Sequence, residues 1–285
     1  MLIANDIDRL YKQAIKEVLS TGEIVTARGL TFKELRFQHL VLRNPRARII
    51  QNQVRKFSQK FMAAEFIWMM RGGEDVNSIS FYNKRMGNFS DDGLVLSGAY
   101  GPRLRCWHGV DQIANIIRLL KEDNNTRQAV MIILDPARDL VAKTKDVPCN
   151  DLLQLIHRNG KLHMSCYVRS NDLNWGFPYD VFHWTLLQEM VAAELGFELG
   201  EYNHFIGSMH VYDKDYESMI HVAGDDTEHV EMKPMPKGVS VVDTIDRLDV
   251  FERTYREQGQ VDYCGLDGWW VNFAANIITN ENSRG

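Results

Sequence analysis

One cysteine of this sequence stands where a thiol could act as a nucleophile. Cys149 follows a proline in the segment DVPCN (146–150), and a proline-led segment can present a thiol at the edge of a strand. The alternative is that Cys149 is a small buried hydrophobic residue, as most single cysteines are. Cys106, Cys166 and Cys264 are interpreted in that way. The cysteines form no CxxC pair and no histidines cluster at metal-ligand spacing, so we expect no metal site.

Two carboxylates precede strongly apolar segments. Glu65 comes directly before FIWMM (66–70), and Asp180 precedes the most apolar stretch of the chain. Asp180 either caps the N-terminus of a helix or faces a ligand. Buried acids are uncommon unless they are paired or functional, so Glu65 is a candidate for acid–base chemistry.

Further polar side chains could hold a sugar or an anion. The cluster RSND (169–172) has two interpretations, a solvated loop or part of a site. His210 and Tyr212 lie two residues apart in a predicted strand and therefore share one face, either as polar tips in a core strand or as contacts to one ligand. Guanidinium groups suit phosphate, although spacing alone does not show whether arginines converge. The candidates for such an anion site are Arg28, Arg105, Arg127 and Arg169.

Helices and strands of several kinds must position these groups. Apolar periodicity, capping residues and glycines predict four helices. They cover residues 7–19, closed by Gly22; 63–70, ended by Gly72 and Gly73; a segment capped by Asp111 that runs to Leu120; and 181–195, stopped by Gly196. Residues 129–134 predict a buried strand, and Asn159-Gly160 predicts the turn of a hairpin over 152–170. Strands mixed with long helices, without a regular βαβ rhythm, indicate an α+β fold.

The composition is that of a globular protein. The 285 residues include 33 Lys and Arg and 38 Asp and Glu, a net charge of −5, with 45% hydrophobic residues. These values exclude a disulfide-stapled miniprotein, a disordered tail and a fibrous repeat. The acidic balance argues against a protein that binds nucleic acid directly. The sequence shows no linker, signal peptide or membrane span, so we expect one domain over residues 1–285, in the cytoplasm.

Motifs in this order resemble those of the thymidylate synthase family. EFIWMMRG (65–72), YGPRLR (100–105) and DQI (111–113) resemble the family's E-L-L-W-F-L-x-G, Y-G-x-x-W-R and D-Q-I. PCN (148–150) resembles P-C-H, RSND with GFPYD (176–180) resembles R-S-x-D with G-x-P-F-N, and HVY (210–212) resembles H-x-Y. The resemblance runs from Thr21 to Tyr216. It implies a mixed β-sheet packed with long helices, with one sheet face forming a dimer interface.

The resemblance also implies a role for each matching position. Cys149 is the thiolate that adds to C6 of a pyrimidine nucleotide, with Arg169 nearby to lower its pKa and to bind phosphate. Glu65 orders water for proton transfer. The other implied roles are phosphate binding by Arg28 and Ser170, with Arg127 reaching across from the second subunit of a homodimer; binding of the sugar 3′-hydroxyl by His210 and Tyr212; and contact with methylenetetrahydrofolate by Asp172, Glu65 and Trp68.

Asp180 departs from the family pattern. The synthases carry an Asn at this position, whose amide donates to O4 of uracil and accepts from N3–H. An ionised carboxylate can only accept, which suits the exocyclic amine of cytosine. Facing uracil O4, it would place two acceptors together at a cost of about 1–3 kcal/mol. The Asp is the residue expected in the deoxycytidylate (dCMP) 5-hydroxymethylases of phages, a branch of this family.

Further departures concern the step that follows one-carbon transfer. The tryptophan pair of the synthases is absent from residues 81–86, and the tail over 278–285 is polar. Reduction of an exocyclic methylene by the folate needs a dry site, so a wetter site favours addition of water and a hydroxymethyl product. The paired arginines of the family are Arg127-Gln128 here, so we expect one phosphate contact to be lost or replaced.

The sequence therefore predicts a dCMP 5-hydroxymethyltransferase that uses 5,10-methylenetetrahydrofolate and no metal. We expect a cytoplasmic homodimer, in the host cytoplasm if the protein comes from a phage. The alternatives are a dCMP 5-methyltransferase and a CMP 5-hydroxymethylase, and, less favoured, a thymidylate synthase and a non-catalytic relative that binds nucleotide or RNA. Phage DNA modification and nucleoside-antibiotic biosynthesis both remain open as pathways.

Overall fold

The computed structural model describes residues 1–141, 143–227, 229–263 and 265–278. The strands are β1 (Leu2–Ala4), β2 (Glu23–Ala27), β3 (Leu30–Leu42), β4 (Val130–Ile132), β5 (Asn150–Arg158), β6 (Lys161–Asp172) and β7 (Glu198–Tyr212). The helices are α1 (Ile7–Thr21), α2 (Gln59–Met70), α3 (Val76–Tyr82), α4 (Tyr100–Arg105), α5 (Gln112–Glu122), α6 (Pro136–Asp139), α7 (Gly176–Leu195), α8 (Tyr216–Gly224), α9 (Val241–Gln258) and α10 (Gly268–Ile278). Short 3₁₀ segments cover Lys84–Phe89, Trp107–Gly109 and Asp213–Asp215.

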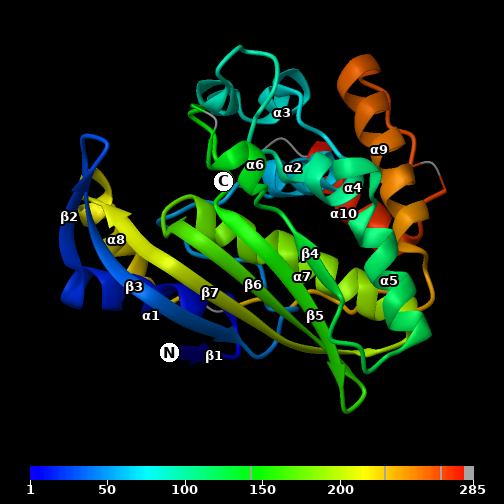
Figure 1. Cartoon of the computed structure of the whole chain (residues 1–285), viewed down its shortest axis with the longest axis horizontal. Helices are drawn as coiled ribbons and strands as arrows, with labels where there is room; N and C mark the ends of the chain where they lie inside the picture. The colour runs from blue at the N-terminus through cyan, green and yellow to red at the C-terminus, as the bar shows by residue number, and fades with distance from the viewer. Residues whose placement is uncertain (142, 228, 264, 279–285) are drawn as a thin grey trace.

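The strands form one mixed sheet in the order β1-β3-β7-β6-β5-β4, with β2 paired to β3 (Figure 1). The pairs β1–β3 and β6–β7 are parallel, whereas β2–β3, β3–β7, β5–β6 and β4–β5 are antiparallel. Together with the long helices, this sheet confirms the predicted α+β fold.

Strand register gathers three of the sequence motifs at one end of the sheet. Ser170 pairs with Ser208 and Asp172 pairs with His210, so β6 and β7 end side by side. The antiparallel hairpin returns the start of β5 to the same place, where the backbone N–H of Arg169 donates to the carbonyl oxygen of Cys149 over 2.9 Å. The thiol, the RSND cluster and the HVY segment are therefore neighbours.

Helix α7 covers the central strands and carries Asp180 into this region. Its residues from Phe177 to Ala193 are buried, as expected of a helix that is apolar on every side. Figure 1 shows α7 behind the central strands and α1 and α8 beside β3. Helices α2, α4, α9 and α10 lie together in the upper right of the view.

Two predicted helices begin earlier than expected. Helix α2 starts at Gln59, where Ser58 caps it by accepting from the backbone N–H of Phe61 at 3.0 Å. Helix α7 starts at Gly176, because proline is tolerated in a first turn and Pro178 does not delay the helix. Asp180 therefore lies inside α7, and its interpretation as a helix cap is wrong.

Other local predictions can be compared directly. Asn159 and Gly160 have φ values of 52° and 77°, which confirms the tight turn. Asp111 caps α5 by accepting from the backbone N–H of Ala114 at 3.0 Å, also as predicted.

Cys166 is buried as expected, but Cys106 is exposed, so its predicted burial is wrong. Cys264 and the polar tail at 279–285 lie outside the described residues. None of the described helices is long and apolar enough to cross a membrane.

Candidate active site

A cavity of about 590 Å³ opens where the three motifs meet, a size typical of small-molecule sites. It lies between α2, the segment Lys84–Phe89, the start of α7 and the adjoining ends of β5, β6 and β7. The cavity is lined by most of the side chains that the sequence predicts for the site, namely Glu65, Trp68, Cys149, Ser170, Asp172, Asp180, His210 and Tyr212.

The thiol of Cys149 is positioned by Arg169. The guanidinium Nε donates to the carbonyl oxygen of Pro148 at 2.8 Å, and Nη2 donates to that of Val147 at 3.0 Å. Nη2 also lies 3.8 Å from Sγ of Cys149. Arg169 therefore fixes the backbone before the thiol and places a positive charge beside it.

Burial raises the pKa of the Cys149 thiol to about 11, while the positive charge of Arg169 acts to lower it. The prediction that Arg169 lowers this pKa is right in direction, but desolvation is the larger effect. The thiol is thus mainly protonated near neutral pH, and its attack on an electrophile requires loss of that proton.

Asp180 is held by two amides. Nδ2 of Asn150 donates to Oδ1 of Asp180 at 3.0 Å, and Nδ2 of Asn171 donates to Oδ2 at 2.8 Å. Burial raises the pKa of Asp180 to about 7, against the lowering effect of these two hydrogen bonds. Both the ionised and the protonated form are therefore accessible near neutral pH, so Asp180 can accept hydrogen bonds or donate one.

Glu65 projects from α2 towards the same cavity. Its Oε2 is buried with no hydrogen-bond partner among the described residues, and it lies 3.7 Å from Nε2 of His183. Burial, and secondarily the charge of Asp180, raise the pKa of Glu65 to about 8. Burial lowers the pKa of His183 to about 4, so this imidazole is neutral. A carboxyl group with such a pKa and an open oxygen suits general acid–base chemistry.

His210 and Tyr212 stand together on β7, as the sequence predicts. Their rings meet edge to face with centroids 5.1 Å apart, and both line the cavity. Ser170 lines it from β6. This end therefore presents hydroxyl, imidazole and phenol groups suited to a sugar and its phosphate.

The four candidate arginines do not all converge. Arg169 lies beside the thiol, and Arg28 lies at the tip of the β2–β3 hairpin, where its charge acts to lower the pKa of Tyr212 against the larger effect of burial. Arg105 instead pairs with Asp111 at 3.2 Å, so its place in the anion site is not supported. Arg127 is exposed and does not line the cavity.

Aromatic groups also line the cavity. Trp68 lines it, with its indole N–H donating to the carbonyl oxygen of Asp75 at 3.1 Å. Trp175 also lines it, and the guanidinium carbons of Arg55 and Arg85 lie 5.5 and 5.2 Å from the centre of its ring. Flat faces, an acid and nearby cations suit a planar, polar co-substrate such as a folate.

Sequence reasoning missed the contributions of Asn150, Asn171 and His183. Asn150 and Asn171 were treated only as members of motifs, although Asn150 begins β5 next to Cys149 and Asn171 is the last residue but one of β6, between Ser170 and Asp172. His183 lies three residues after Asp180, a spacing that places both on one face once α7 is known to include them. Among the described residues, no group of three or more His, Cys, Asp or Glu is arranged to hold a metal ion.

Comparison with known proteins identifies related sequences. The model of the thymidylate synthase family matches residues 9–260. Similar curated proteins include the deoxyuridylate hydroxymethyltransferases of Bacillus phage SP01, with 38% identity over 74% of this chain, and of Pseudomonas phage M6, with 37% over 60%. A third, from Delftia phage PhiW-14, shows 32% identity over 70% of this chain. The matches cover 58%, 49% and 58% of these relatives, so the chain spans about half of their length.

Proposed function

Because the chain belongs to the thymidylate synthase family, we propose that it transfers a one-carbon unit from 5,10-methylenetetrahydrofolate to C5 of dCMP and yields 5-hydroxymethyl-dCMP. The observation that carries this proposal is that Cys149 and Asp180 face one cavity. A thiol can attack C6 of a pyrimidine there while a carboxyl group holds the far edge of the same ring.

Cys149 supplies the nucleophile in this reaction. Addition of Sγ to C6 makes C5 nucleophilic, and C5 forms a bond to the methylene carbon carried by the folate. C5 then loses its proton while the bond from that carbon to the folate nitrogen breaks, which releases tetrahydrofolate and leaves an exocyclic methylene on C5. Departure of the thiolate at the end restores the C5–C6 double bond. Arg169, with Nη2 3.8 Å from Sγ, stabilises the thiolate, and His210, Tyr212 and Ser170 hold the sugar and phosphate.

Asp180 recognises the base through one shared proton. With cytosine, one carboxyl oxygen shares the proton with N3 while the other accepts from the N4 amine. Negative charge builds on the ring after thiol addition, and the carboxyl group can deliver its proton to N3 at that stage. The pKa of about 7 makes this proton available near neutral pH.

Glu65 is the group we assign to the final water addition. Its buried Oε2 has an open hydrogen-bonding position, and a water molecule placed there would lie within the same cavity as C5. In its ionised form Glu65 accepts a proton from that water as its oxygen attacks the exocyclic methylene carbon. Loss of Cys149 then leaves a hydroxymethyl group on C5.

A second candidate substrate is dUMP. The three relatives are named for hydroxymethyl transfer to deoxyuridylate. A protonated Asp180 can donate to O4 and accept from N3–H, and its pKa of about 7 provides that form. The hydroxymethyl product is common to both candidates.

We also propose a homodimer in which Arg127 serves the phosphate site of the partner. Rings stack on the sheet face opposite α7, with centroids 4.1 Å apart for His39 and Phe205 and 4.8 Å for Tyr167 and Phe205. Tyr167 remains 37% exposed, so this face can pack against a second sheet. Mixing inactive Arg127→Ala and Cys149→Ala proteins tests this, because mixed dimers regain one complete site. No recovery of activity would contradict the proposal.

The proposed activity is tested by mass spectrometry of an equimolar mixture of dCMP, CMP and dUMP after incubation with the protein and methylenetetrahydrofolate. We expect a hydroxymethyl group on dCMP. A hydroxymethyl group on CMP or dUMP in its place would reject dCMP as the substrate. A methyl group on any of the nucleotides would show that water does not add in the final step. No modified nucleotide would reject the activity.

A further inference from the structure

Glu34 of β3 does not line the cavity, but it contacts β7 beside a residue that does. It lies opposite His210 in the register of the two strands, and its side chain reaches Ser208. We propose that Glu34 is a positioning residue: by taking the hydrogen of Ser208, it holds His210 in the tautomer whose Nε2 accepts a hydrogen bond. This end of the cavity thereby selects a nucleotide with a hydrogen-bond donor at its 3′-position. The inference rests on the proposed function, because it concerns the sugar contact assigned there to His210.

The hydroxyl group of Ser208 has one hydrogen, and Glu34 takes it. Oγ of Ser208 donates to Oε1 of Glu34 over 2.5 Å. Among the described residues Glu34 forms no ion pair, so its carboxylate is not engaged by a cation in place of the serine. With its hydrogen used in this way, Oγ has only lone pairs to offer to other neighbours. Ser208 is therefore an acceptor towards His210.

His210 turns one ring nitrogen to Ser208. Nδ1 lies 3.3 Å from the carbonyl oxygen of Ser208 and 3.4 Å from its Oγ. Because both oxygens act as acceptors, Nδ1 must carry a hydrogen. Burial lowers the pKa of His210, against the raising effects of the Ser208 carbonyl and the charge of Glu34, so the ring is neutral near neutral pH and holds only that hydrogen. Nε2 is therefore an acceptor.

Nε2 is the ring nitrogen left for a ligand. His210 lines the cavity, while its Nδ1 is turned back to its own strand. Among the described residues no group forms a hydrogen bond with Nε2, and Tyr212 and Ser170 line the same cavity. A sugar hydroxyl placed there donates to Nε2. A substituent that can only accept would set two acceptors face to face, which is costly.

Loss of Glu34 should reverse the tautomer of His210. In Glu34→Ala the hydroxyl of Ser208 is free to donate to Nδ1, which moves the ring hydrogen to Nε2. The double variant Glu34→Ala/Ser208→Ala lacks that hydroxyl as well, so the backbone carbonyl is again the partner of Nδ1 and the hydrogen returns there. A purely structural effect of losing Glu34 would not be repaired by a second truncation.

The tautomer is measured by nitrogen NMR of protein with isotope-labelled histidine, because a protonated and a bare ring nitrogen resonate far apart. The signals of His210 are assigned by their loss in His210→Gln. We expect the hydrogen on Nδ1 in wild type and in the double variant, and on Nε2 in Glu34→Ala. The matched control is Glu23→Ala, which removes an exposed acid that pairs with Arg36 at 2.8 Å and should match wild type. Hydrogen on Nε2 in wild type, or no change in Glu34→Ala, would overturn the inference.

The effect on recognition is measured with dCMP and its 3′-fluoro analogue, in which fluorine replaces the 3′-hydroxyl group at similar size but cannot donate. Both compete in one vessel, so the product ratio does not depend on the fraction of folded enzyme. Glu34→Ala should lower the preference for dCMP by about three- to tenfold, the net value of one hydrogen bond, and the double variant should restore it. An unchanged ratio together with a reversed tautomer would overturn the assignment of His210 to the 3′-position.

Binding supplies the same comparison where turnover is low, since competition of the two nucleotides for the site can be measured by equilibrium dialysis. The same fall in preference in Glu34→Ala would support the inference, and equal preference in all variants would contradict it. A wild-type protein that converts no nucleotide would reject the proposed function. Conversion of dCMP by a protein with hydrogen on Nε2 of His210 would reject only this inference.

Discussion

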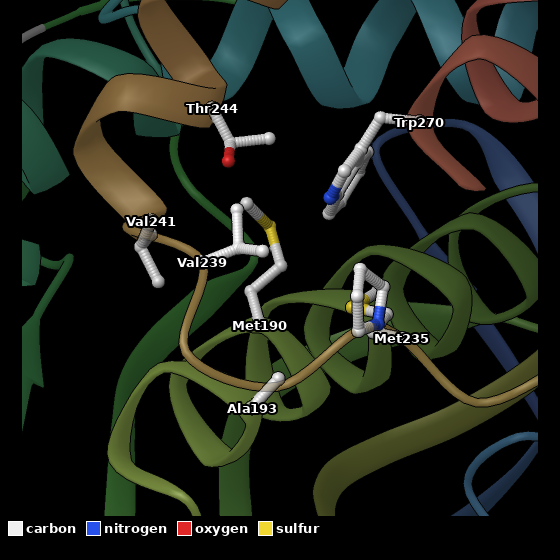
Figure 2. A pocket seen from close by; sticks show the side chains of 8 residues that line it. Met190, Ala193, Met235, Val239, Val241, Thr244 and Trp270 are labelled. Atoms are coloured by element: carbon white, nitrogen blue, oxygen red, sulfur yellow. The ribbon is translucent and has the colours of Figure 1, made fainter. Parts of the chain in front are cut away.

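The cavity beside Cys149 measures about 590 Å³, whereas a second cavity between α7, α9 and α10 measures about 10 Å³, which is about the space of one water molecule. A thiol, several carboxyl groups and imidazoles line the first. Figure 2 shows Met190, Met235 and Trp270 closing the second, together with small apolar side chains and Thr244.

The contrast shows where packing and function impose different requirements. Flexible methionine side chains fill irregular gaps, and Met190 and Met235 leave little space in the second cavity. Apolar groups in the first would shield Glu65 from water, although its Oε2 has no hydrogen-bond partner among the described residues, and this is costly. Substitutions in the first cavity should therefore change activity, and those in the second should change stability.

The largest effect should come from Cys149→Ala. Removal of the nucleophile should lower turnover by about a thousandfold or more, because the thiol that forms the bond to C6 is lost. The thermal unfolding midpoint should stay near that of wild type. The exposed Cys106→Ala is the matched control and should keep full activity. Activity of Cys149→Ala within tenfold of wild type would show that another group is the nucleophile.

Met190→Ala should lower the free energy of unfolding by about 2–5 kcal/mol, because it enlarges a cavity in a packed core. The KM for dCMP should stay within about twofold of wild type, since Met190 is absent from the active-site cavity. Met190→Leu, which nearly conserves volume, should cost under about 1.5 kcal/mol. Urea unfolding and steady-state kinetics measure both quantities. A large change in KM would remove the distinction between the two cavities.

Asp180→Asn should shift the preference towards dUMP by about 10–100-fold, because the amide donates to O4 without needing an added proton. The measurement is the ratio of kcat/KM for dUMP and dCMP on one preparation. An unchanged ratio would show that Asp180 does not recognise the base.

Glu65→Gln should change the pH dependence of stability. The folded-state pKa of about 8 lies above the ordinary glutamate pKa of 4.5, so between these pH values the folded protein holds a proton that the unfolded chain has lost. The contribution of Glu65 to stability is therefore complete at low pH and is lost as the pH rises towards 8. The variant should gain stability relative to wild type between pH 5 and pH 8, by about 1–2 kcal/mol after allowance for the partly exposed side chain. Denaturant unfolding at both pH values measures this, and parallel profiles would contradict the burial of a neutral Glu65.

Local patterns were sufficient to predict much of the site. Cys149, the RSND cluster and His210 with Tyr212 lie in short motifs, and strand alternation placed the last two on one face. The α+β class also followed from local periodicity and from the Asn159-Gly160 turn. These features depend on residues close together in the chain.

Features that depend on tertiary packing could not be predicted in this way. The contact of Asn171 with Asp180 requires α7 to lie across β6, and no spacing in the sequence specifies that distance. The helix was predicted over 181–195, with Asp180 as a possible cap before it, whereas α7 begins at Gly176 because a proline fits within the first turn. The high pKa of Cys149 likewise follows from burial by distant segments.

The central claim, that Cys149 attacks a pyrimidine whose base Asp180 holds, is tested most directly with 5-fluoro-dCMP and 5-fluoro-dUMP in the presence of methylenetetrahydrofolate. Fluorine at C5 cannot leave as a proton does, so the nucleotide stays bonded to the attacking thiol. Mass spectrometry of the digested protein should find the adduct on the peptide that contains Cys149, with more formed from 5-fluoro-dCMP. An adduct on another residue, or none with either nucleotide, would contradict the account.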